Sequence, residues 1–304
     1  MHPPRRALNC WNKYYSEFLV TKSNLVRLTY VKIRKADFFM ERAAKRGIAI
    51  PMIQGVVITY AFLLVEFVLN ELGMFEGPLR LYLTDSPLRF LFGGIALFLI
   101  SANYKKQRSL YSLKELFTNK FSWKAYIYML PFIVCLALIL LTIVFSYTHS
   151  LRAAGQFALC SLQQLGTGFY EEAVRVLILC GFMKFFCNTK SQRVKTVLIS
   201  GVLFGLSHGL NFLYGQDILS TLEQVAGCFA WGMLMAALFL YTKNLTLLMV
   251  IHAVWDIIVR FPKAFFGFPK VSTGIMVLDV IGDVIQYVIM PVTAVIICLR
   301  LDKD

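Results

Sequence analysis

Long apolar runs separated by short basic segments constrain this chain more than any other feature. Apolar residues make up 58% of the sequence and charged residues 16%, whereas an ordinary soluble domain is about 25% charged. About 20 apolar residues cross the hydrocarbon core of a bilayer. We therefore predict an all-α, polytopic membrane protein with about eight transmembrane helices, at 50–72, 86–103, 124–148, 154–186, 194–214, 217–242, 244–261 and 273–299.

The distribution of basic residues predicts the orientation of these spans. With the N-terminus in the cytoplasm, 24 Lys and Arg lie inside and six outside, and Arg175 lies within a span. Cytoplasmic segments of membrane proteins carry this excess of Lys and Arg. We therefore expect both termini to be cytoplasmic. The net charge of +14 is then a consequence of topology, and it does not indicate a nucleic-acid partner.

Two regions follow from this reading. Residues 1–49 form a basic, cytoplasmic N-terminal segment with interspersed aromatic residues. This segment is either an amphipathic stretch that binds anionic headgroups or an ordinary positive-inside tail. No cleavable signal peptide is visible in it. Residues 50–300 form a single transmembrane domain. The seven cysteines make no CxxC pair and are interpreted as reduced packing residues.

Three of the predicted spans contain ionisable residues. A charged side chain at the bilayer centre costs roughly 2.5–3.5 kcal/mol on insertion scales, so its presence indicates a function. The fourth span holds an acidic pair followed by an arginine, the fifth a histidine, and the seventh a histidine and an aspartate. These residues are Glu171, Glu172, Arg175, His208, His252 and Asp256.

Helical spacing groups these side chains within each span. Arg175 lies three residues after Glu172 and four after Glu171, so it can pair with either carboxylate. The other carboxylate is then free to act as a base or a ligand. His252 and Asp256 share one face of their helix, and Asn211 can join the face of His208. A rise of 1.5 Å per residue allows all three clusters to meet near the middle of the membrane.

Two kinds of chemistry suit such a constellation. With a metal, Glu171, His208 and His252 would be a zinc set with an open fourth position. Without one, Glu171 and His208 could act as general base and acid, and His252 and Asp256 would stabilise an oxyanion. Both routes hydrolyse an amide bond. A serine nucleophile is less favoured, because Ser207 and His208 point in different directions on a helix.

At these positions the sequence resembles the CAAX-protease and bacteriocin-processing (CPBP, or Abi) family of intramembrane proteases. The family motifs are EExxxR, FxxxH and HxxxN/D, in this order on separate helices. The second and third match as Phe204-x-x-x-His208 and His252-x-x-x-Asp256. The first is one residue short, as Glu171-Glu172-x-x-Arg175. The resemblance covers about residues 154–262.

The resemblance implies an eight-helix fold with a cavity open to membrane and cytosol. It implies catalytic roles for Glu171, His208, His252 and Asp256, with Glu172 and Arg175 in support. The expected function is hydrolysis of a peptide bond in a hydrophobic or lipid-associated peptide or protein. Its partners would be that substrate and membrane lipids, its setting a bacterial cell membrane, and its cofactor zinc or none.

Two other classes of function remain open. A non-catalytic membrane protein, conferring immunity to a peptide toxin or acting as a scaffold, is the first alternative. A proton- or cation-coupled transporter is the second, because acids also lie at Glu66, Glu223, Asp279 and Asp283. No internal repeat or symmetric pair of broken helices supports transport.

Overall fold

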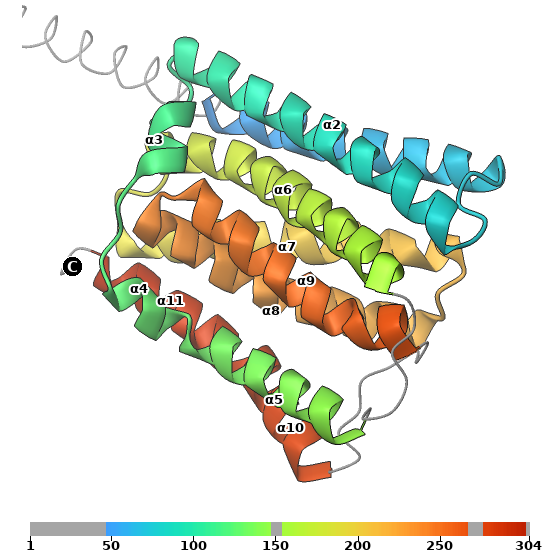
Figure 1. Ribbon diagram of the computed structural model, residues 1–304. Coiled ribbons are helices and arrows are strands. Elements are labelled where there is room, and N and C mark those ends of the chain that lie inside the picture. The colour runs from blue at the N-terminus through green and yellow to red at the C-terminus, as the bar shows by residue number, and fades with distance from the viewer. Residues whose placement is uncertain (1–46, 147–153, 267–275, 302–304) are drawn as a thin grey trace, which may run out of the picture. The chain divides into compact units, whose positions relative to one another are not determined.

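The computed structural model describes residues 47–146, 154–266 and 276–301. Within these ranges the regular elements are all helices, and no strand is found (Figure 1). The predicted N-terminal segment 1–49 lies almost wholly outside the described residues. The all-α prediction is confirmed for the part of the chain that the structure covers.

The chain runs back and forth along one bundle of helices. The first described helix is Gly47–Glu71. Those that follow are α2 (Pro78–Lys105), α3 (Leu113–Thr118), α4 (Lys124–Tyr128), α5 (Leu130–Ser146), α6 (Ala154–Phe185), α7 (Lys190–His208), the 3₁₀ helix η1 (Gly209–Tyr214), α8 (Ile218–Thr242), α9 (Leu245–Phe266), α10 (Met276–Val284), the π-helical turn η2 (Ile285–Ile289) and α11 (Met290–Arg300).

Five of the described helices are long and apolar enough to cross a membrane. They are Gly47–Glu71, Leu79–Lys105, Lys190–Tyr214, Ile218–Thr242 and Val277–Arg300, and Leu130–Leu141 is a shorter apolar helix. The chain is therefore an integral, multi-pass membrane protein. α6 and α9 are not among the five, and these two helices carry most of the predicted site. The count of eight spans stays a prediction.

The helix boundaries correct the sequence reading in one important place. The second span was expected at 86–103, but α2 begins at Pro78 and brings Asp85 into the same helix as Arg89. Prolines explain two of the breaks elsewhere. Pro131 follows the junction between α4 and α5, and Pro291 follows the π-helical turn. Proline lacks the N–H that an α-helix needs in its interior and clashes with the preceding turn.

Small residues allow the site helices to approach closely. A Cβ atom on Gly168 of α6 would lie 2.8 Å from the Met249 carbonyl oxygen of α9. A Cβ atom on Gly205 of α7 would lie 2.8 Å from the Val225 carbonyl oxygen of α8. Both distances are too short for a side chain. The backbones that present the acidic pair and the two histidines are thereby held against their neighbours.

Polar caps fix where two of these helices begin. Thr189 and Gln192 form a capping box at the start of α7, which satisfies amides that have no partner within the helix. Asp217 caps α8 by accepting a hydrogen bond from the Ser220 backbone N–H at 2.9 Å. Hydrogen bonds from Ser220 lower the pKa of Asp217, so this carboxylate stays charged at neutral pH.

Candidate active site

The acidic pair on α6 is divided between two environments. Glu172 is fully buried, and both of its oxygens accept hydrogen bonds from Arg175, at 2.9 Å from Nε and 3.2 Å from Nη2. The side chain of Glu171 keeps 17% of its surface exposed. The sequence left open which glutamate pairs with the arginine. The structure assigns that ion pair to Glu172, at the i,i+3 spacing.

Arg175 is itself enclosed by α7 and α8. Its Nη1 donates to the Gly232 carbonyl oxygen at 3.4 Å, and its Cζ lies 4.0 Å from the centre of the Phe204 ring. A guanidinium over an aromatic face gains electrostatic energy when it is desolvated. Phe204, the first residue of the FxxxH motif, therefore packs the Arg175–Glu172 ion pair from the side of α7.

His252 of α9 faces three carboxylates. Its Nδ1 donates to Glu172 Oε1 at 2.7 Å. Its Nε2 lies 3.5 Å from Glu171 Oε2 and 3.8 Å from Asp256 Oδ2. Carboxylate oxygens accept hydrogen bonds, so this arrangement suits an imidazole that carries a proton on both nitrogens. His252 thus joins the two glutamates of α6 to the aspartate of α9.

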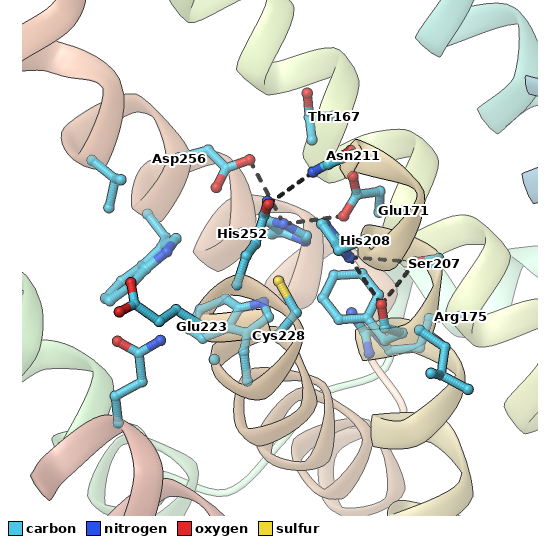
Figure 2. Close-up of a pocket in the computed structure, with 18 of the residues that line it drawn as sticks. Thr167, Glu171, Arg175, Ser207, His208, Asn211, Glu223, Cys228, His252 and Asp256 are labelled. Carbon is cyan, nitrogen blue, oxygen red and sulfur yellow. Dashed lines mark hydrogen bonds and ion pairs between the residues drawn. The ribbon is translucent and has the colours of Figure 1, made fainter. Parts of the chain in front are cut away.

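His208 ends α7 on another side of the same space. Its Nδ1 lies 2.9 Å from the Phe204 carbonyl oxygen, which can only accept, so Nδ1 carries the proton. Nε2 of the neutral ring is then an acceptor. The centroid of the Phe204 ring lies 4.8 Å from that of the His208 ring and 6.1 Å from that of the His252 ring. Figure 2 shows Glu171, His208, His252 and Asp256 converging from three helices.

These groups open onto a cavity of about 1050 Å³. Glu171, Arg175, His208, His252 and Asp256 all line it, so the structure brings these predicted residues together. Glu172 is absent from the lining because it is buried behind them. Aromatic side chains complete the wall, and Trp231 stacks on Trp255 with centroids 5.1 Å apart. Figure 2 shows Glu223 and Cys228 of α8 facing the same space.

The geometry does not form the predicted zinc set. Among the described residues, no three His, Cys, Asp or Glu side chains are grouped so that they could hold a metal ion. Hydrogen bonds at Nδ1 hold both imidazoles in place, to Glu172 for His252 and to the Phe204 carbonyl for His208. Because no such group of three is found, we derive no catalytic step through a metal.

One sequence expectation near His208 comes out differently, and a second agrees with the structure. Asn211 was expected to continue the face of His208, but α7 ends there and η1 begins. The Asn211 amide instead donates to Gln224 Oε1 of α8 at 2.8 Å. The Ser207 hydroxyl donates to the Phe204 carbonyl at 2.7 Å, which occupies its proton. This bond agrees with the expectation that Ser207 is not the nucleophile.

A second polar cluster lies at the cavity wall, and of its members the sequence pointed only to Glu66. Arg89 of α2 donates from Nε to Asp85 Oδ2 at 2.6 Å and from Nη2 to Glu66 Oε1 at 3.1 Å. Gln163 of α6 donates to Asp85 Oδ2 at 2.5 Å. The i,i+4 spacing of Asp85 and Arg89 was the available signal. It was lost because Asp85 fell just before the expected start of the span.

Taken together, the fold and the site define a helical membrane protein with carboxylates and imidazoles buried around an internal cavity. Residues 153–258 match the family model described as Type II CAAX prenyl endopeptidase Rce1-like. This stretch contains α6, α7, α8 and the part of α9 that bears His252 and Asp256. The resemblance to the CAAX-protease family is therefore confirmed. Neither the search of curated proteins nor that of solved structures found a match.

Proposed function

We propose that this protein is an intramembrane endopeptidase in which Glu171 activates a water molecule without a metal. The observation that carries the proposal is the division of the acidic pair. Glu172 is committed to Arg175 and His252, whereas Glu171 lies at the cavity wall with part of its surface exposed. A base must be able to reach the water whose proton it takes, and Glu171 meets this requirement.

The reaction follows from these positions. Glu171 accepts a proton from water, and the hydroxide attacks the carbonyl carbon of the scissile peptide bond. The Nε2–H of His252 stabilises the oxyanion that develops. The C–N bond then breaks as Glu171 returns the proton to the leaving amine. His208 helps to hold the water through Nε2, which is free to accept a hydrogen bond.

Asp256 has a supporting role in this scheme. Its Oδ2 lies 3.8 Å from His252 Nε2, one helical turn along α9. A negative charge at this place favours the protonated ring and helps to keep its Nε2–H directed toward the cavity. An ionised aspartate has no proton to donate to an oxyanion, so His252, and not Asp256, supplies the hydrogen bond.

The substrate we propose is a hydrophobic or lipid-associated peptide or protein. The matching family description names prenyl endopeptidases, and the cavity is lined by aromatic and aliphatic side chains beside the charged ones. The finer topology we propose is eight spans with both termini in the cytoplasm of a bacterial cell. The Lys and Arg excess on one side of the predicted spans supports that orientation.

The test is cleavage of a quenched fluorescent, prenylated peptide by the purified, reconstituted protein. Glu171→Gln removes the base while keeping the size of the side chain, and we expect cleavage to fall by about 10²–10⁴-fold. Asp85→Asn is the matched control, because it neutralises a buried carboxylate that does not line the cavity. Wild-type cleavage by a folded Glu171→Gln variant would refute the mechanism.

A further inference from the structure

The cavity is closed toward one end of the helix bundle and reaches the other. On α8 its lining runs from Ser220 to Trp231. At 1.5 Å per residue, this lining begins about 3 Å from one end of the helix and stops about 16 Å short of the other. The rest of α8 closes the cavity, since every residue from Met233 to Leu240 that is named in the core is at most 3% exposed.

Other helices repeat this asymmetry. On α7 the lining begins at Ser200, about 15 Å after the first residue, Lys190, and continues to the last residue, His208. Along α10 and α11 it begins at Leu278, about 3 Å from the first residue, and stops at Met290, about 15 Å before Arg300. The open end therefore lies near the η1–α8 connection and the start of α10.

The two ends of the bundle also differ in charge. The closed end carries the helix ends and connections around Lys105, Lys190 and Lys243, and Glu115 is the single acid among its described residues. The basic residues there are Lys105, Lys106, Arg108, Lys114, Lys120, Lys124, Lys184, Lys190, Arg193, Lys195, Lys243 and Arg300.

The open end has the opposite character. The basic residues Arg80, Arg260 and Lys263 lie at this end together with Glu71, Glu76 and Asp217, and the acids Glu66, Glu223, Asp279 and Asp283 line the cavity nearby. Segments rich in Lys and Arg stay in the cytoplasm, whereas acidic residues contribute little to orientation. The closed end is therefore the cytoplasmic one by this rule.

We propose that the catalytic cavity opens on the extracytoplasmic side of the membrane. This inference rests on the proposed function and names its substrate class further. The peptide bond that is cut belongs to a hydrophobic segment presented from the outer half of the membrane, after export or insertion. It differs from the cytosolic opening that the family resemblance led us to expect.

Site-specific labelling tests the proposal directly. Ser220→Cys places a thiol at the cavity opening, and Asn188→Cys places one on the exposed connection between α6 and α7 at the basic end. The probe is a membrane-impermeant sulfonated maleimide, applied to intact cells and to inverted vesicles. Labelling is read at each peptide by mass spectrometry, so the seven native cysteines can remain.

We expect intact cells to label Ser220→Cys and inverted vesicles to label Asn188→Cys. Labelling of Ser220→Cys in inverted vesicles alone, or of both positions from one side, would overturn the proposal. If either variant fails to accumulate, a fluorescent protein that matures only in the cytoplasm is fused to the wild-type C-terminus, next to Arg300 at the basic end. Fluorescence places the basic end in the cytoplasm and supports the proposal, whereas a fusion that inserts but does not fluoresce opposes it. Labelling requires no cleavage, so its outcome is separate from that of Glu171→Gln.

Discussion

Two arginines inside the helix bundle, Arg175 and Arg89, form ion pairs with carboxylates, and they are used differently. Arg175 binds Glu172, which also accepts a hydrogen bond from His252, so that Glu171 next to it is left at the cavity wall. Arg89 binds both acids within its reach, Asp85 and Glu66. In the first cluster the arginine pairs with one carboxylate and leaves the other without an arginine partner, whereas in the second cluster the arginine pairs with both carboxylates.

The difference lies in the histidine. Each cluster has one fully buried acid, Glu172 or Asp85, and one acid that is partly exposed, Glu171 or Glu66. Only the Arg175 cluster has an imidazole whose two nitrogens face carboxylates. The Arg89 cluster has the Gln163 amide in that place. A buried ion pair thus indicates a catalytic site when a side chain that can gain or lose a proton is hydrogen-bonded to it.

The largest effects are expected from removal of each arginine. Arg175→Met and Arg89→Met each leave a buried carboxylate without its counter-ion, which costs about 3–5 kcal/mol of stability. The two variants should differ in cleavage per folded molecule. Arg175→Met releases Glu172 and His252, and a displacement of about 1 Å at a site can cost 10²-fold in rate. Arg89→Met should keep most of its cleavage.

Thermal unfolding in detergent and cleavage by the folded fraction measure the two quantities separately. Loss of cleavage in Arg89→Met equal to that in Arg175→Met would show that both clusters belong to the active site. Equal and near wild-type cleavage in both variants would show that neither does.

A smaller effect is expected when each ion pair is replaced by apolar side chains. Exchanging a whole buried ion pair for packed apolar residues is often neutral or stabilising by about 1–4 kcal/mol. Asp85→Leu/Arg89→Met and Glu172→Leu/Arg175→Met should therefore both unfold at temperatures closer to wild type than the single arginine variants do. Cleavage should return only in the first double variant. Recovery of cleavage in the second would mean that Glu172 does not position His252.

The smallest effect is expected from metal removal. A chelator should leave the cleavage rate unchanged, because the described residues offer no group of three side chains arranged to hold a metal ion. Metal analysis of the purified protein accompanies this assay. Loss of cleavage on chelation, restored by added zinc, would instead support the zinc set of Glu171, His208 and His252.

Much of the fold could be predicted from apolar run length. The spans expected at 154–186 and 217–242 correspond to α6 and α8 within one residue at each end. The second span was too short in the prediction, because the apolar window was ended at the charge of Asp85. Inside the bundle Arg89 pairs with Asp85 on its own helix and with Glu66 on another, and sequence alone does not show a partner on another helix.

The site shows the same limit. Spacing placed Glu171, Glu172 and Arg175 on one helical face, but it could not decide which glutamate the arginine binds. That choice depends on His252, which lies 80 residues further along the chain and takes Glu172 as its partner. Likewise, Asn211 follows His208 at helical spacing in the sequence, yet the change from α7 to η1 turns it toward Gln224.

The central claim is that the two adjacent glutamates have separate tasks. Glu171→Gln and Glu172→Gln, assayed together for thermal unfolding and for peptide cleavage, test it most directly. We expect Glu171→Gln to unfold near the wild-type temperature and to lose cleavage, and Glu172→Gln to unfold at a clearly lower temperature. A Glu171→Gln variant that is destabilised as much as Glu172→Gln, or that cleaves at the wild-type rate, would contradict this account.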